Sequence, residues 1–317
     1  MRRFTRCLSV GALSVGAALA ASPRAECAPR LQLASTLCSP HQPTVVLVHG
    51  LDSCRETWKN TLAALSARGV PSLALDLRGH GESPLGDVAD FSASELALDV
   101  LGSIRGSGVS SALLVGHSMG GRIAMRAAAL DALSESPVLR GVVIEDMDLR
   151  VRPFIVPPSS AAAEQALARF GGPDGHRFAS FEEAEAALLP FYDAPRVAGW
   201  RGTRVRQLFD GSWWSDISPL AQRLARETVL ASNDGGEAWD ALGVLGVQHR
   251  LSVDVWHAPA LGTVCALTGD GSIEDMAARL PCAEVREFAK ASHSVHNSNH
   301  EEFIEALCVR LRSYSLS

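Results

Sequence analysis

The chain has 317 residues, of which 47% are hydrophobic and 20% are charged, and its formal charge is −6. This composition describes a folded globular protein and excludes disordered, collagen-like and coiled-coil classes. The acidic balance, with no stripe of Lys and Arg in the body of the chain, argues against a nucleic-acid binder. The length predicts one large α/β domain or two small domains.

The first 40 residues differ in composition from the rest. They hold five arginines and one acid, so the remaining chain carries 24 basic and 34 acidic residues, a charge of −10. An apolar run at 8–20 follows a basic start and is too short for an ordinary membrane span. We expect residues 1–40 to be a presequence, removed or disordered, that directs the protein to a mitochondrion or plastid, with a secretory signal as the alternative. We expect no integral membrane span after its removal.

Short apolar runs alternate with helix-length segments from residue 44 onward. Runs that predict strands lie at 44–48, 72–77, 112–115, 141–144, 261–268 and 284–289. Segments that predict helices lie between the first of these, at 55–68, 92–104 and 119–130. The alternation predicts a doubly wound, mostly parallel α/β sheet with right-handed crossovers.

The alternation stops between residues 150 and 256. No comparable strand run occurs there, whereas helical patterns lie at 161–170, 181–189 and 218–230. Eleven of the 18 aromatic residues also lie there, between Phe154 and Trp239. We predict a helical cap at 150–256 inserted into a core formed by 41–149 and 257–317. The rings either line a ligand cavity or form the core of the cap, and both can hold.

The pentapeptide GHSMG at 116–120 matches the pattern G-x-S-x-G. It directly follows a predicted strand and directly precedes an Ala-rich helix. In this context the serine sits on a sharp, strained turn and its hydroxyl projects above the sheet, so Ser118 is the candidate nucleophile. The N–H of Met119 and that of Leu51, which follows the first strong strand, are the candidate donors of an oxyanion hole.

A serine hydroxyl needs an imidazole to accept its proton. His293 is the best placed histidine because it lies between the last predicted strand and the last helix. Ser298 and Glu301 form a capping-box pattern that predicts the start of that helix. His296 and His300 are nearby alternatives to His293, whereas His117 is predicted to be a packing residue.

Four motifs in this order resemble the α/β-hydrolase family: HG at 49–50, DLRGHGES at 76–83, the 116–120 pentapeptide and the late His293. The resemblance covers residues 43–314 and implies the α/β-hydrolase fold with a serine hydrolase activity. Members cleave esters, thioesters, amides and other bonds, so the resemblance implies the catalytic machinery more than the substrate. A carboxylate nucleophile, as in the dehalogenases and epoxide hydrolases of this fold, is excluded by Ser118.

The resemblance also implies the third catalytic residue. The commonest family position follows the seventh strand, and Ser272 stands there, with Asp270 two residues earlier. Asp146 follows the sixth strand, as in the esterases and acyl hydrolases of the family whose acid has moved to that place. We therefore predict Asp146 as the acid, with Asp270 as the alternative, Ser272 as a possible auxiliary residue, and Asp148 or Glu145 as lesser alternatives.

The predicted function is cleavage of a carboxylic ester or thioester through an acyl-enzyme on Ser118, with a small-molecule substrate. No cofactor and no metal is expected, because no metal-binding or nucleotide motif is present. The alternatives are a ligand-binding relative without turnover and an acyltransferase that uses the same nucleophile. The acidic charge favours a neutral substrate, and a coenzyme A thioester would need basic residues such as those at 201–206.

Overall fold

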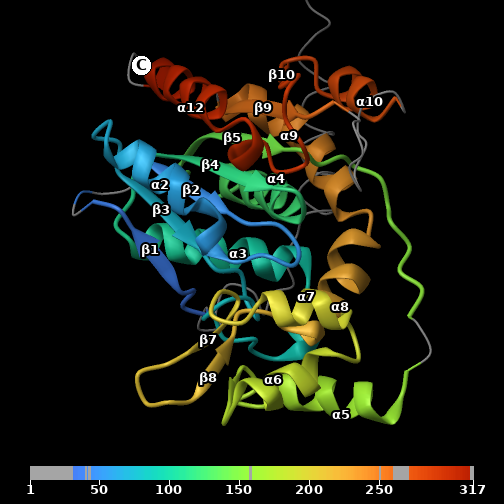
Figure 1. Ribbon diagram of the computed structural model, residues 1–317. Coiled ribbons are helices and arrows are strands. Elements are labelled where there is room, and N and C mark those ends of the chain that lie inside the picture. The colour runs from blue at the N-terminus through green and yellow to red at the C-terminus, as the bar shows by residue number, and fades with distance from the viewer. Residues whose placement is uncertain are drawn as a thin grey trace, which may run out of the picture.

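The computed structural model describes residues 31–39, 41, 44–156, 159–249, 251–259 and 271–314. Its centre is a seven-stranded sheet with the order β1-β3-β2-β4-β5-β9-β10 (Figure 1). The strands are β1 (Ser35–Leu37), β2 (Val45–Val48), β3 (Ser72–Leu75), β4 (Ala112–His117), β5 (Leu139–Glu145), β9 (Ser252–His257) and β10 (Glu284–Glu287). The β1–β3 pair is antiparallel and the other pairs are parallel. The predicted doubly wound, mostly parallel sheet is confirmed. The predicted boundary at residue 40 is wrong, because β1 belongs to this sheet and Leu33 is buried in its core.

Helices cover both faces of this sheet. One face packs against α3 (Ala93–Gly106), α4 (Met119–Ala132) and α9 (Asp234–His249), and α10 (Ser272–Arg279) lies beside α9. The other face packs against α2 (Lys59–Ser66) and α12 (His300–Tyr314). Every residue of β2 is buried, as expected for a strand that is covered on both sides. Short turns are η1 (Arg55–Trp58), η2 (Val88–Asp90) and α11 (Val295–Ser298).

The strand beside β5 is β9, at a place where the sequence pattern predicts none. Its residues pair in parallel with β5 on one side and with β10 on the other. The sequence SVDVWH places an acid in the interior, and buried Asp254 is stabilised by an ion pair with Arg310 of α12. This polar residue broke the apolar run on which the prediction depended. The predicted strand at 261–268 lies outside the described residues.

The chain leaves the main sheet after β5 and forms a separate layer, at the bottom of Figure 1. We call residues 150–230 the insertion. It contains α5 (Ala161–Phe170), α6 (Phe181–Leu188), α7 (Ala194–Gly199), α8 (Pro219–Ala225) and the π-helical turn η3 (Arg226–Leu230). Its buried core gathers Phe170, Phe178 and Phe181. At least these three rings therefore pack against one another rather than line a cavity.

Two features of the insertion differ from the prediction. It includes a small antiparallel sheet, in the order β6 (Arg177–Phe178), β8 (Trp213–Ser215) and β7 (Val205–Gln207). Strands of two or three residues are too short to show a periodic pattern, so only helices were predicted. In addition, α9 packs on α4 and β9 belongs to the main sheet. The departure from the core therefore ends near residue 230 and not at 256.

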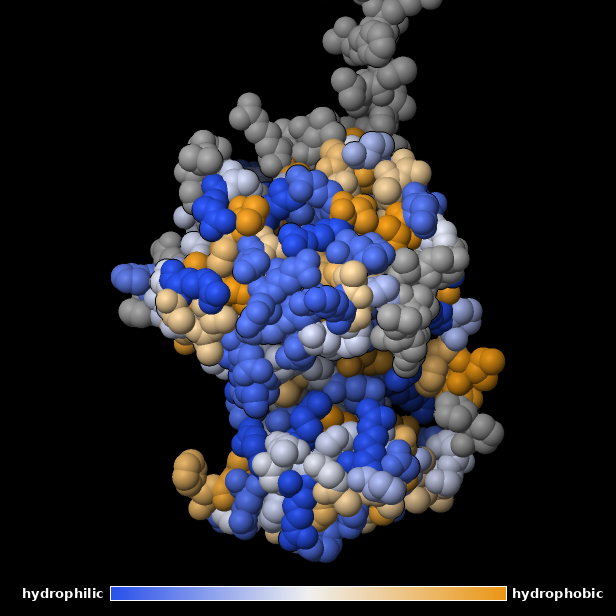
Figure 2. Space-filling view, turned by 45° about the horizontal axis from the view of Figure 1, so that its top comes forward, coloured by the Kyte–Doolittle hydropathy of each residue, from blue (hydrophilic) through white to orange (hydrophobic). Residues whose placement is uncertain are grey.

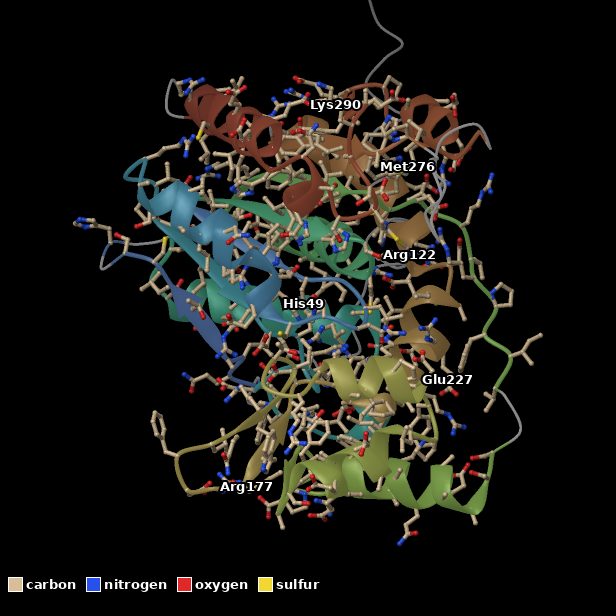
Figure 3. The ribbon with its side chains drawn as sticks, viewed as in Figure 1. His49, Arg122, Arg177, Glu227, Met276 and Lys290 are labelled. Carbon is tan, nitrogen blue, oxygen red and sulfur yellow. The ribbon has the colours of Figure 1, made fainter. Side chains whose placement is uncertain are left out.

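Arg122, on the helix that follows the predicted nucleophile, ties both ends of the insertion to the core. Its side chain is fully buried and donates to the main-chain oxygens of Val229 and Leu230, each at 3.3 Å, and to that of Arg150. Figure 3 shows it pointing from α4 toward the chain that leads into α9. Burial is the main cause that lowers the pKa of Arg122 to about 10, so the guanidinium is charged at neutral pH.

Replacing Arg122 by methionine is expected to lower the free energy of unfolding by about 3 kcal/mol, because buried carbonyl oxygens lose a charged donor. Thermal or urea unfolding followed by circular dichroism measures this loss. Arg140→Gln, which changes an exposed arginine of β5, is the matched control and should stay within about 0.5 kcal/mol of wild type. Equal stabilities of the two variants would contradict this role of Arg122.

The C-terminal helices begin differently from the prediction. Ser298 ends α11 instead of capping the last helix: its hydroxyl accepts from the N–H of Ser292 at 2.8 Å and donates to the carbonyl of Ser294 at 2.9 Å. The last helix, α12, starts two residues later, at His300. None of the helices in the described ranges has the length and apolar character that a membrane span requires.

Candidate active site

The turn between β4 and α4 carries Ser118 in a strained backbone conformation, with φ 52° and ψ −124°. Neighbouring glycines make this turn possible. A Cβ on Gly116 would lie 2.2 Å from the carbonyl oxygen of Gly120, and one on Gly120 would lie 2.5 Å from that of His49. The N–H of Ser118 donates to the carbonyl of Glu145 at 2.8 Å, which fixes the turn to the end of β5. The predicted strand–turn–helix context of Ser118 is therefore present.

Gly116→Ala is expected to disrupt this turn, because the added methyl meets main-chain atoms that cannot rotate away. We expect loss of folded protein or at least a hundredfold loss of ester hydrolysis. Gly106→Ala, at the end of α3, is the control, since no atom beyond the neighbouring residues and the backbone of the helix lies within 4 Å of the added Cβ. Thermal unfolding and a p-nitrophenyl ester assay on both variants measure the effect, and a fully active Gly116→Ala would show that the turn tolerates a side chain.

The structure brings Ser118, His293 and Asp146 together in one hydrogen-bonded chain. The Nε2 atom of His293 lies 3.0 Å from the Ser118 Oγ, and its Nδ1 lies 2.7 Å from Asp146 Oδ2. Because a carboxylate only accepts hydrogen bonds, Nδ1 carries the proton and Nε2 is free to accept the serine hydroxyl. Asp146 is buried, whereas His293 is partly exposed. A substrate can therefore reach the serine and the imidazole but not the carboxylate.

The backbone holds Asp146 toward this imidazole. Asp146 follows β5 directly with a positive φ of 50°. Its N–H donates to the carbonyl of Trp256 at 2.8 Å, and its Oδ1 accepts from the N–H of Ala258 at 3.0 Å. The end of β9 therefore fixes both the main chain and the side chain of Asp146, and Oδ2 remains for the histidine.

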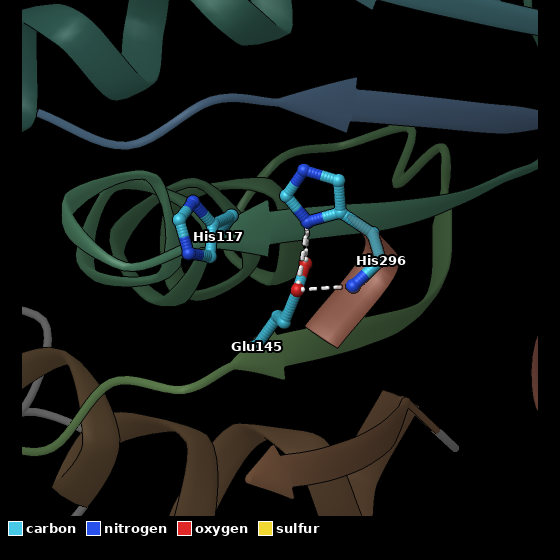
Figure 4. A group of neighbouring side chains, drawn as sticks. All are labelled: His117, Glu145 and His296. Atoms are coloured by element: carbon cyan, nitrogen blue, oxygen red, sulfur yellow. Dashed lines mark hydrogen bonds and ion pairs between the residues drawn. The ribbon is translucent and has the colours of Figure 1, made fainter. Parts of the chain in front are cut away.

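The alternative histidines and acids have other partners. His296 is fully buried and donates Nδ1–H to Glu145, with 2.8 Å to Oε1 (Figure 4). The centre of its ring lies 4.0 Å from that of Trp58. His300 lies against the carbonyl of His296 at 2.9 Å. Asp148 accepts from Arg152 at 2.5 Å. Ser272 is buried in the first turn of α10, and Asp270 lies outside the described residues.

Glu145 connects the segments that carry Ser118, His293 and Asp146. The sequence did not predict this role. Its carbonyl binds the Ser118 turn, it precedes Asp146, and its Oε1 also accepts the main-chain N–H of His296 at 2.9 Å. Burial disfavours the carboxylate, but His296 and His117 outweigh burial and hold the pKa of Glu145 below its usual value. Glu145 is therefore a buried, charged anchor for the loop that presents His293.

His117 completes this polar network. Its Nε2 donates to the carbonyl of His293 at 3.0 Å. Within the described ranges, His117, Glu145 and His296 each offer one atom that could coordinate a metal ion, and these three atoms lie within 4.8 Å of one another. Hydrogen bonds already use one ring N–H of each histidine and the carboxylate, so we interpret the group as a positioning network for the His293 loop.

Gly50 brings the turn after β2 against the nucleophile. A Cβ at Gly50 would lie 2.9 Å from the Ser118 Cβ, so the main chain at Gly50 passes directly beside the serine, and Leu51 is the next residue. Met119 is the first residue of α4, where main-chain N–H groups have no partner inside the helix. The N–H groups of Leu51 and Met119 therefore come from two segments that both adjoin Ser118.

Burial lowers the pKa of three histidines around the site, to about 3 for His49, about 3 for His80 and about 4 for His117. In the unfolded chain they would take up protons near pH 6.5, so the unfolded state binds more protons below that pH. The free energy of unfolding should therefore fall as the pH falls from about 6.5 toward 4. Asp216 acts in the opposite direction, since burial raises its pKa to about 6. Burial also raises the pKa of Asp52, Asp131 and Asp254, but these carboxyls start from 3.8 and therefore act mainly at the acid end of the range, while burial of His176 lowers its pKa and adds to the fall.

Thermal unfolding between pH 7.5 and 4.5 measures this dependence. We expect a steadily lower Tm below pH 6.5 and a shallower fall in His80→Gln, which lacks one of the three groups. A Tm that does not change between pH 6.5 and 5 would contradict it.

Comparison with known proteins supports the same family. The profile of the alpha/beta hydrolase family matches residues 45–306. The chain is 26% identical over 277 residues to "sn-1-specific diacylglycerol lipase ABHD11" of Xenopus tropicalis, covering 84% of this chain and 77% of that protein. It is 36% identical over 109 residues to "Protein phosphatase methylesterase 1" of Mus musculus, covering 33% and 28%.

Among solved structures, the fold is similar to a "Marine microorganism esterase", with a TM-score of 0.61, 17% identity and coverage of 88% of this chain and 98% of that one. A "Thioesterase Domain From Curacin Biosynthetic Pathway" matches with a TM-score of 0.58, 18% identity and coverage of 88% and 94%. These likenesses concern the fold. The profile match, which spans most of the chain, shows that the protein belongs to the alpha/beta hydrolase family.

Proposed function

We propose that this protein is a serine hydrolase that cleaves a carboxylic ester or thioester through an acyl-enzyme on Ser118. The observation that carries the proposal is the hydrogen-bonded chain from Ser118 through His293 to Asp146, on a turn that holds the serine in a strained conformation. The curated relatives bear the names of a lipase and a methylesterase, which are ester-cleaving enzymes.

In the proposed mechanism, the Ser118 Oγ attacks the substrate carbonyl carbon while His293 Nε2 takes the hydroxyl proton. Asp146 holds the opposite ring N–H and stabilises the imidazolium that forms. The C–O or C–S bond to the leaving group then breaks, and His293 returns the proton to that group. A water molecule, deprotonated by the same imidazole, attacks the acyl-enzyme and releases the acid and the free serine.

The main-chain N–H groups of Leu51 and Met119 would hold the oxyanion of each tetrahedral intermediate. Both adjoin Ser118, and the Met119 N–H lies at the N-terminus of α4, where the helix dipole favours negative charge. Such donors typically contribute about 10²–10³ in rate. The insertion would act as the cap over this site, since Arg204 within it donates to the carbonyl of Asp52, next to Leu51.

Labelling with a fluorophosphonate tests the proposal, together with hydrolysis of p-nitrophenyl esters of graded chain length. We expect the wild-type protein to be labelled on Ser118 and to release p-nitrophenol. Product analysis with added butanol separates hydrolysis from acyl transfer, because a transferase would form the butyl ester. A folded wild-type protein that is neither labelled nor active would contradict the proposal.

A further inference from the structure

The recess between the main body and the insertion is rich in hydrophilic side chains (Figure 2). Three arginines of the insertion gather around Asp52, in the turn that follows β2. Arg196 and Arg226 each place Nη2 3.8 Å from Asp52 Oδ2. Arg204 donates Nη2–H to the main-chain oxygen of Asp52 at 3.0 Å. All three guanidinium groups act on the Asp52 carboxyl electrostatically, although burial still raises its pKa.

These three positive charges surround Asp52, and Asp216 is a second acid that acts electrostatically on Arg204, whereas neighbouring arginines are each paired with an acid. Arg206 lies 2.5 Å from Glu82, and Arg223 lies 3.0 Å from Glu227. Arg204 takes part in no salt bridge within the described ranges, and its buried Nε has no hydrogen-bond partner there. The three arginines therefore form a local surplus of positive charge in a protein whose formal charge is −6.

The surplus lies beside the nucleophile. A Cβ on Gly50 would be 2.9 Å from the Ser118 Cβ, and Asp52 is two residues further along the chain. Two residues span at most about 7 Å, so the Asp52 Cα lies within about 12 Å of the Ser118 Cβ. The turn that holds Asp52, and with it the arginines, therefore belongs to the surroundings of Ser118.

The insertion also holds a pocket of about 280 Å³, and one of the three arginines, Arg226, contributes to its lining. Arg226 lines it together with Phe154 and Tyr192, and the Arg226 guanidinium lies 5.9 Å from the centre of the Phe154 ring. Most of the lining is apolar, and Arg223 and Gln222 are its other polar members close to Arg226 in sequence. It suits a ligand that combines an apolar part with a negatively charged group.

We propose that the substrate carries an anionic group, a carboxylate or a phosphate, which Arg204 binds together with Arg196 and Arg226 while the scissile carbonyl lies at Ser118. The inference rests on the proposed function and specifies its substrate class. A guanidinium presents parallel N–H groups that match the two oxygens of a carboxylate or phosphate. The Nε–H of Arg204 has no hydrogen-bond acceptor among the described residues. The overall acidic charge favoured a neutral substrate, but this local arrangement points to a charged one.

Two pairs of substrates test the proposal and distinguish the sources of the anion. Mono-p-nitrophenyl adipate and methyl p-nitrophenyl adipate differ by one carboxylate charge. Butanoyl coenzyme A and S-butanoyl-N-acetylcysteamine differ by the phosphate-bearing part. We expect kcat/KM to be at least about tenfold higher for the charged member of one pair, and to fall with added salt. A preference in the first pair identifies a carboxylate and one in the second a phosphate; no preference in either pair would overturn the proposal.

Variants then connect the preference to these arginines. Arg204→Gln and Arg226→Gln are expected to lose most of the charge preference, because kcat/KM falls more for the charged member of the pair than for the neutral member. Arg177→Gln is the matched control, because Arg177 is exposed at the far end of the insertion and is paired with Asp210 at 2.5 Å (Figure 3). A preference that survives in both Arg204→Gln and Arg226→Gln would overturn the assignment.

A binding measurement separates this inference from the proposed function. Isothermal titration of Ser118→Ala with monomethyl adipate and with dimethyl adipate needs no turnover. If the carboxylate is the anion, the monomethyl compound binds at least tenfold more tightly, and Arg204→Gln in the same background removes the difference. Hydrolysis without any charge preference overturns the inference alone. An inactive, unlabelled wild type with arginine-dependent binding overturns the proposed function but leaves the anion site.

Discussion

Replacing Ser118 by alanine is expected to lower kcat for ester hydrolysis by about 10⁶-fold, because the acyl-enzyme can no longer form. His293→Ala should lose about as much, since the hydroxyl is a poor nucleophile without a base at 3.0 Å. The double variant should be no slower than either single variant, because the two residues act as one unit. Steady-state assays with a p-nitrophenyl ester measure the three rates.

Circular dichroism controls for folding, because both side chains are at least partly accessible and their loss leaves no large cavity. Independent losses that multiply in the double variant would contradict a shared mechanism. His296→Asn offers a comparison within the same loop. It should reduce activity through the position of His293, and not abolish it.

Asp146→Asn is expected to lower kcat by about 10⁴-fold with little change in KM. An amide can donate to His293 Nδ1, so the imidazole adopts the tautomer that has its proton on Nε2 and cannot accept one from Ser118. The isosteric change keeps the hydrogen bond from the N–H of Ala258, which limits the structural damage. Steady-state kinetics with a chromogenic ester measure kcat and KM separately.

Glu145→Gln is the matched comparison, because it changes the adjacent buried carboxylate by the same single atom. Its carboxylate binds His296 and not His293, so we expect a smaller loss, about tenfold to a hundredfold in kcat. If Glu145→Gln were as inactive as Asp146→Asn, these rates would not single out Asp146 as the catalytic acid. If Asp146→Asn kept full activity, Asp146 would have no catalytic role.

The positions of Ser118 and His293 were predictable because local sequence determines them. The glycines two residues either side of Ser118 permit a turn that no other residue type allows, and the strand before it and helix after it have strong patterns. The loop between β10 and α11 places His293 at the same edge of the sheet. Asp146 was harder to assign, since several acids follow strands and only the end of β9 shows which one is held toward the imidazole.

Other features were not predictable, because they depend on how the insertion lies on the core. Arg122 is one of 29 basic residues in sequence, and only the folded chain shows that it ties both ends of the insertion. Likewise, Arg204 and Asp52 are separated by 152 positions and meet only through the orientation of the insertion. The strand β9 escaped detection because its buried acid is neutralised by a distant arginine.

Mass spectrometry of the enzyme quenched during turnover addresses the proposed chemistry most directly. An ester with a slowly hydrolysed acyl group, mixed with wild-type protein and quenched in acid within the first turnover, should leave one acyl group on the peptide that contains Ser118. The adduct should disappear as substrate is exhausted and be absent from Ser118→Ala. Product formation with an acyl group on another residue, or undiminished product formation by Ser118→Ala, would contradict an acyl-enzyme on Ser118.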